Sequence, residues 1–113
     1  MKLLFIITKG LEKAGSAIRA MQVAAMTASQ GNHVEVLLMD EAVQWARGIK
    51  AGGESLLDYM DMLNTSERPI FVCQSCAEKR LISQDDLIEG TAMITMPTVV
   101  AKLASSDYKV LSF

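Results

Sequence analysis

The chain has 113 residues, 50% of them hydrophobic and 21% charged, which is enough apolar surface for one hydrophobic core and one globular domain spanning residues 1–113. A net charge of -2 without a cluster of lysines or arginines gives no footprint for nucleic acid or an anionic membrane, so small molecules or other proteins are the expected partners. No stretch approaches the roughly 20 apolar residues of a membrane-spanning helix, and we expect a cytoplasmic protein.

The first part of the chain predicts an alternation of strands and helices. It begins with a continuous apolar run, which is typical of a strand buried on both faces of a parallel sheet. Apolar residues then recur at helical spacing after Ser16, a candidate N-cap, and stop before Gly31, a candidate helix end. Asp40 is a candidate cap for a short helix after the second strand. The four expected elements lie at residues 2–7, 16–30, 33–39 and 40–47.

The remaining chain continues this alternation. Gly48, Gly52 and Gly53 indicate a loop before the next helix, and Pro69 indicates the start of the third strand. Ser83 is a candidate cap for a turn, and Pro97 suits the first turn of a helix. The expected elements are helices at residues 56–63, 74–80 and 97–104, a turn at 85–88, and strands at 70–73, 91–95 and 108–113.

The order of these elements predicts the fold class. Five strands separated by helical segments are typical of an α/β protein, because each helix carries the chain back to begin a parallel neighbour. We therefore expect a three-layer α/β/α architecture with a mostly parallel five-stranded sheet.

The strongest functional signal is the segment FVCQSCAEKR, residues 71–80. Cys73 lies where a parallel strand ends and a helix begins, and ligands of open α/β sheets gather at that edge. Free N–H groups at the start of a helix favour a thiolate over a thiol, and Lys79 and Arg80 add positive charge. Cys76, one turn later, could resolve an oxidised Cys73 as a disulfide. The spacing therefore indicates a reactive thiol pair.

The two cysteines also have other interpretations. Free cysteine is among the most buried residue types, so both could be packing residues. A closed zinc site needs about four ligands, whereas the chain offers two sulfurs and a single histidine, His33. A dithiol oxidoreductase is a further alternative, although thioredoxin-like motifs usually carry apolar or proline residues where this chain has Gln74 and Ser75. We expect neither a metal nor a cofactor.

Two weaker features are interpreted structurally. Residues 10–16 have the glycine spacing of a phosphate-binding loop, but Ser16 stands where that loop requires its lysine, so the match fails. Trp45 lies in a polar context and is interpreted as a subunit contact, because aromatic anchors are enriched at interfaces.

A family resemblance depends on three segments and on the order of the elements. The segments are VCQSCAEKR at residues 72–80, DLIEG at 86–90 and DYKVLSF at 107–113. Together they resemble the DsrE/DsrF family, which includes the YchN-like and TusD-like proteins. Cys73 matches the sulfur-carrying cysteine of the TusD-like branch, and Cys76 matches the second cysteine of the YchN-like branch. Members usually have glycine after the arginine that matches Arg80, where this chain has Leu81, so a different helix-ending turn is expected.

The resemblance implies a cytoplasmic three-layer domain that assembles into homotrimers or homohexamers. It also implies a sulfur-relay protein that carries sulfane sulfur as a cysteine persulfide between a donor and an acceptor protein. The expected reactive residues are Cys73, Cys76 and Arg80. The alternative is a non-enzymatic oligomeric interaction or regulatory module with redox-sensitive or structural cysteines. Whether the chain acts as a sulfurtransferase stays open at this point.

Overall fold

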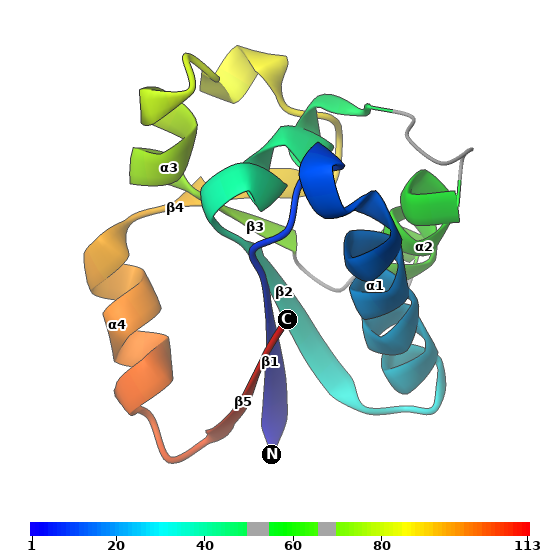
Figure 1. The fold of residues 1–113 in the computed structure, drawn as a ribbon. Coiled ribbons are helices and arrows are strands. Elements are labelled where there is room, and N and C mark those ends of the chain that lie inside the picture. The colour runs from blue at the N-terminus through cyan, green and yellow to red at the C-terminus, as the bar shows by residue number, and fades with distance from the viewer. Residues whose placement is uncertain (50–54, 66–69) are drawn as a thin grey trace.

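Strands and helices alternate along the computed structural model, which describes residues 1–49, 55–65 and 70–113 (Figure 1). Within these residues the strands are β1 (Lys2–Ile7), β2 (His33–Leu38), β3 (Ile70–Cys73), β4 (Thr91–Ile94) and β5 (Tyr108–Ser112). The α-helices are α1 (Ala14–Ser29), α2 (Ser55–Thr65), α3 (Gln74–Lys79) and α4 (Met96–Ala104). Short 3-10 helices are η1 (Leu11–Lys13), η2 (Asp40–Arg47) and η3 (Gln84–Asp86).

The strands form one sheet in the order β4-β3-β2-β1-β5. Every neighbouring pair is parallel, and the register places Leu38 of β2 beside Val72 of β3, and Cys73 beside Ile94 of β4. This confirms the predicted three-layer α/β class, with a five-stranded sheet that is parallel throughout.

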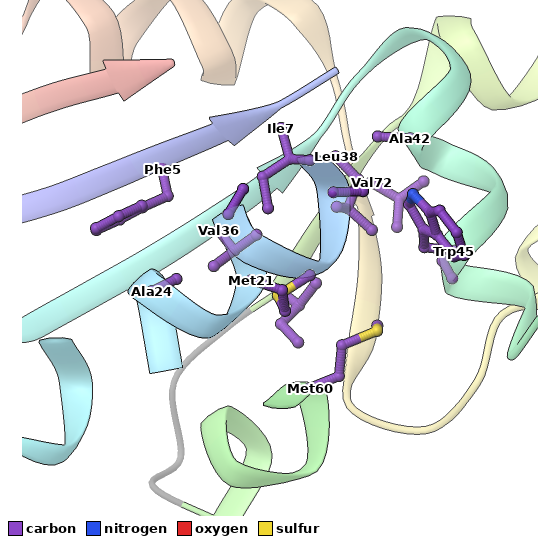
Figure 2. Packing of buried hydrophobic residues seen from close by; sticks show 14 of the residues in the cluster. Phe5, Ile7, Met21, Ala24, Val36, Leu38, Ala42, Trp45, Met60 and Val72 are labelled. Atoms are coloured by element: carbon purple, nitrogen blue, oxygen red, sulfur yellow. The ribbon is translucent and has the colours of Figure 1, made fainter. Parts of the chain in front are cut away.

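Most of the core lies on one face of the sheet, under α1, α2, α3 and η2. Figure 2 shows Val36, Leu38 and Val72 of the strands packed with Met21 of α1 and Met60 of α2. The buried face of α1 consists mostly of alanines, which favour the helix and let it lie close to the strands. The alternation of side chains along each strand explains why these residues share a face.

The opposite face of the sheet has a smaller core under α4 alone. Leu4, Leu37 and Ile94 pack there with Val99 of α4. Figure 1 shows α4 on one side of the sheet, with α1 and α2 on the other. The helix that follows β3 lies on one face of the sheet, and the helix that follows β4 lies on the other. The carboxyl ends of β3 and β4 therefore form a topological switch point, where successive connections leave the sheet on opposite faces. In open α/β sheets such a point is the usual place for a binding or reactive site.

Three sequence-based predictions about single residues are wrong. Ser16 does not cap a helix, because η1 leads directly into α1 and Lys13 holds the N-cap position. Asp40 is not the cap of η2, since Met39 takes that position and Asp40 begins the helix. Trp45 is no surface contact, because it is fully buried and its indole N–H donates to the Lys9 carbonyl at 2.8 Å. The expected roles of Gly52, Gly53 and Pro69 lie outside the described residues.

Candidate functional site

Cys73 occupies the junction between β3 and α3. It is the last residue of the strand and the N-cap of the helix, and it is 1% exposed. The Ser75 hydroxyl oxygen lies 3.4 Å from its sulfur. The side chains and the main-chain N–H groups of Ser75 and Cys76 act on the pKa of this thiol as hydrogen-bond donors.

These donors change the acidity of Cys73. Burial has the largest single effect and raises its pKa, as expected for a charge removed from water. The four hydrogen bonds together outweigh burial, and they bring the pKa below the ordinary value of a cysteine. A lowered pKa increases the fraction of thiolate, which is the nucleophilic form.

Cys76 lies one turn later on α3 and is partly exposed. Burial raises the pKa of its thiol, and its hydrogen bond to Cys73 raises it further. The main-chain N–H of Asp40 bonds to the same sulfur and acts in the opposite direction. Cys73 is therefore the more acidic thiol of the pair, and Cys76 the less acidic one. Both cysteines are free of disulfide bonds.

Arg80 connects α3 to η2. Its Nε and Nη2 donate to Glu41 Oε1 at 3.1 and 2.6 Å, and its Nη1 donates to the Cys76 carbonyl at 2.9 Å. The hydrogen bond from Arg80 lowers the pKa of Glu41, and the same pairing raises that of Arg80. The structure thus brings the predicted residues Cys73, Cys76 and Arg80 together, with Arg80 fixing the helix that carries Cys76.

Asp40 and Glu41 are site residues that the sequence analysis missed. Both lie more than thirty residues before the cysteines, at the end of β2. The available signal was positional: β2 neighbours β3, so the carboxyl ends of the two parallel strands meet at one edge of the sheet. Within the described residues, no three His, Cys, Asp or Glu side chains group so as to hold a metal ion.

Leu81 follows Arg80 with a φ of +58°. The N–H groups of Leu81 and Ile82 bond to the carbonyls of Glu78 and Ala77 at 3.1 and 2.9 Å, which is the Schellman arrangement that usually has glycine at this position. The expected difference in the turn is therefore wrong, because leucine adopts the left-handed conformation itself.

Two surface depressions flank the outer side of α3. One, of about 210 Å³, is lined by Gln74, Ser75, Glu78, Thr95 and Met96, where β3 and β4 end. The other, of about 500 Å³, is lined by Gln74, Glu78, Leu81, Ile82, Ser83, Gln84 and Met93. Neither Cys73 nor Cys76 lines these two depressions.

An all-parallel five-stranded sheet with a free thiol pair where β3 enters α3 defines an α/β protein with a cysteine-based site. The chain belongs to the DsrE/DsrF-like family, whose model matches residues 1–113. Membership supports a general role of the sulfur-relay type. None of the helices in the described part of the chain has the length and apolar character to cross a membrane.

The chain is also similar to individual proteins and solved structures. The crystal structure of the YchN protein of E. coli superimposes with a TM-score of 0.85 and 25% identity, covering 100% of this chain and 99% of that one. An uncharacterized protein of Methanocaldococcus jannaschii is 30% identical over 113 residues, which cover 95% of this chain and 96% of the relative. A protein of unknown function from Methanobacterium thermoautotrophicum shares the fold, with a TM-score of 0.74 and 11% identity over 99% of this chain and 98% of that one.

Proposed function

We propose that this protein carries sulfane sulfur as a persulfide on Cys73 between a donor protein and an acceptor protein. The observation that supports it most is the position of Cys73 at the end of β3 and the N-cap of α3, with the Ser75 hydroxyl oxygen 3.4 Å from its sulfur. Sulfur transfer requires a partly ionised thiol and needs no cofactor. Membership of the DsrE/DsrF-like family supports the same chemistry.

Loading and unloading are two displacements of the same kind. The Cys73 thiolate attacks the outer sulfur of a donor persulfide, so that a new S–S bond forms on Cys73 and the donor leaves as a thiolate. An acceptor thiolate then attacks the outer sulfur of Cys73-S-SH, which restores the Cys73 thiolate. Neither step is a net oxidation or reduction, so no oxidant or reductant is required.

Cys76 offers a competing reaction. Its thiolate can attack the inner sulfur of Cys73-S-SH, form the Cys73–Cys76 disulfide and expel hydrosulfide. The disulfide must then be reduced by a dithiol reductant before the next cycle. The raised pKa of Cys76 slows this release, because less of its thiolate is present at neutral pH.

Access to Cys73 requires movement of α3. Cys73 is 1% exposed, so a donor must displace the first turn of this six-residue helix. We place partner docking over the depression at Gln74, Ser75 and Met96, which adjoins that turn.

The test is mass spectrometry of the chain after incubation with a persulfide donor. Wild-type protein and Cys76→Ser should gain 32 Da, about the mass of one sulfur atom, whereas Cys73→Ser should gain nothing. The adduct should persist longer in Cys76→Ser, since a serine hydroxyl cannot expel sulfide at neutral pH.

The contrary result is equally clear. A folded wild-type chain that stays unmodified by both a small persulfide donor and a sulfurtransferase would refute the carrier role. The function left would then be a non-enzymatic interaction module with packed cysteines, and the low exposure of Cys73 favours that alternative.

We further propose that the chain works in the cytoplasm, where free thiols stay reduced, and as a homotrimer or homohexamer. The outer side of α4 supports assembly, because Met96, Val100 and Leu103 are each more than 40% exposed. Light scattering should give three or six times the chain mass of 12.3 kDa. A species of 12.3 kDa alone at micromolar concentration would refute assembly.

A further inference from the structure

A pocket of about 500 Å³ lies where β1 and β5 end, at the same edge of the sheet as the thiol pair. Figure 1 shows the end of β5 beside β1, and β2 separates β1 from β3 and Cys73. Ligands of open α/β sheets gather at this edge, and the volume of the pocket is that of a small-molecule site. The lining consists of Lys9, Gly15, Ser16, Arg19, Ala20 and Phe113.

The polar lining of this pocket is cationic. The side chains of Lys9 and Arg19 are exposed, and neither has a hydrogen bond or ion pair with another residue in the described part of the chain. Ser16, one turn before Arg19 on α1, adds a hydroxyl. The Lys9 carbonyl accepts the Trp45 indole N–H at 2.8 Å, which fixes the main chain that carries this lysine.

The hydrogen-bond acceptors next to the pocket already have donors. Glu12 of η1 accepts a hydrogen bond from the Gly10 N–H at 3.0 Å. The Phe113 carbonyl oxygen accepts two from Thr8, one from its N–H and one from its hydroxyl, both at 3.0 Å. Among the described lining residues none is acidic, so the pocket is positively charged on a chain whose net charge is -2.

Phe113 gives the pocket an apolar side. Its ring is 39% exposed and stacks with the ring of Phe5, with the centroids 5.6 Å apart and an angle of 2° between the planes. Phe5 belongs to the core and is 2% exposed, so it holds the Phe113 ring in place. The exposed part of that ring is a surface on which a planar apolar group can pack.

We propose that this pocket binds a small molecule that carries a phosphate group and a planar apolar group. Lys9 and Arg19 bind the phosphate, because its oxygens accept several charge-assisted hydrogen bonds and a guanidinium group can pair with two of them at once. The Ser16 hydroxyl donates to the same group. The planar part packs on Phe113 and fills the volume that a phosphate alone would leave open. This inference does not depend on sulfur transfer.

The test is a titration of the isotope-labelled chain with phenyl phosphate, followed by NMR of the backbone amides. The resonances of Gly15, Ser16 and Arg19 should shift and reach saturation, while those of Cys73 and Cys76 should stay in place. Phenyl phosphate should bind at least about threefold more tightly than inorganic phosphate, because its ring adds a contact with Phe113.

Substitutions separate the parts of the site. Lys9→Met and Arg19→Met should each weaken the binding of phenyl phosphate about fivefold to tenfold, and the double variant should not saturate. Both residues are exposed, so the variants should fold. Phe113→Leu should bind inorganic phosphate like the parent and lose the preference for phenyl phosphate. Lys13→Met is the matched control, because Lys13 is an exposed lysine of η1 that does not line the pocket, and it should leave the affinity nearly unchanged.

Three results would overturn the inference. In the first, phenyl phosphate shifts no resonance of the pocket. In the second, the double variant binds it as tightly as the parent does. In the third, benzoate binds as tightly as phenyl phosphate, which would mean that the pocket does not select a phosphate. None of these measurements uses a sulfur donor, so a chain that takes up no sulfur would refute the proposed function and leave this result standing.

Discussion

Cys73 shows how hydrogen bonds can reverse the effect of burial on a single residue. A cysteine that is 1% exposed would normally have a raised pKa, because an apolar interior disfavours the thiolate. Here the hydrogen-bond donors of Ser75 and Cys76 offset that penalty. The N-cap position supplies them, since the N–H groups of the first helical turn have no partner within the helix.

Removal of one donor should raise the pKa of Cys73. Ser75 is exposed, so Ser75→Ala in the Cys76→Ser background takes away the hydroxyl 3.4 Å from the sulfur without disturbing the core. We expect alkylation of Cys73 at pH 7 to slow about threefold, with the inflection of the rate profile at higher pH.

Ser83→Ala is the control for this prediction. Ser83 lies beyond the other end of α3, where its hydroxyl bonds to Asp86 at 3.1 Å, so its loss removes a hydroxyl far from the thiol. Its alkylation profile should match the parent. An unchanged profile for Ser75→Ala would mean that the hydroxyl does not bond to the thiolate in solution.

At the scale of single elements, the end of α3 carries strain that does not serve the site. Leu81 is 91% exposed and holds the left-handed position of the Schellman turn. Ile82 and Ala77, which the turn brings together, are both buried, and this packing keeps Leu81 in that conformation.

Leu81→Gly should stabilise the protein by about 0.5–1 kcal/mol. Relief of the left-handed conformation gains about 1–2 kcal/mol, and the greater freedom of glycine in the unfolded chain takes back part of it. Chemical denaturation would measure the change, and Cys76 alkylation should stay as in the parent. A loss of stability would show that the exposed leucine makes a favourable contact, such as one with a second copy of the chain.

The sequence predicted elements better than it predicted contacts between them. The sequence predicted all five strands, and it placed Cys73 at the end of the third strand with Cys76 one helical turn later. Asp40 and Trp45 could not be placed in the same way. The polar neighbours of Trp45 describe only its local chain, whereas its burial depends on how η2 packs against the sheet. The place of Asp40 near Cys76 likewise depends on the packing of η2 against α3.

At the scale of the whole molecule, α4 depends on a buried ion pair for its position. Glu35 of β2 is 5% exposed, and Lys102 Nζ of α4 donates to it at 2.8 Å. The Tyr108 hydroxyl at the start of β5 also lies 2.8–2.9 Å from both carboxylate oxygens. The helix contributes Val99 as its buried apolar residue, so this polar network is a large part of what holds it. Because α4 starts at Met96, the network also fixes one wall of the depression beside α3.

The network should stabilise the fold over a defined pH range. Burial raises the pKa of Glu35, but the hydrogen bonds from Lys102, Tyr108 and His33 bring it below its ordinary value of 4.5. The contribution of the Glu35 carboxylate to the free energy of unfolding is thus complete above about pH 4.5. It is lost as the pH falls through the lower, folded-state pKa. Burial lowers the pKa of Lys102, but Glu35 and Tyr108 raise it above 10.5. The contribution of the Lys102 ammonium group to the free energy of unfolding is therefore complete below pH 10.5 and is lost as the pH rises further.

Lys102→Met therefore tests the anchor of α4 through the sign of its pH dependence. At pH 7 it should lower the free energy of unfolding by about 2 kcal/mol, because Glu35 keeps its buried charge without a cation while Tyr108 and His33 still donate to it. The difference from the parent should narrow as the pH falls through the lowered folded-state pKa of Glu35 in the parent, since below it Glu35 is protonated in both proteins. Adding Glu35→Gln should recover part of the loss at pH 7, because no buried charge remains.

Lys109→Met, at an exposed lysine of β5, is the control and should change the free energy of unfolding little at any pH. A Lys102→Met chain that matched the parent in denaturation curves from pH 4 to 9 would show that apolar packing alone holds α4 on the sheet.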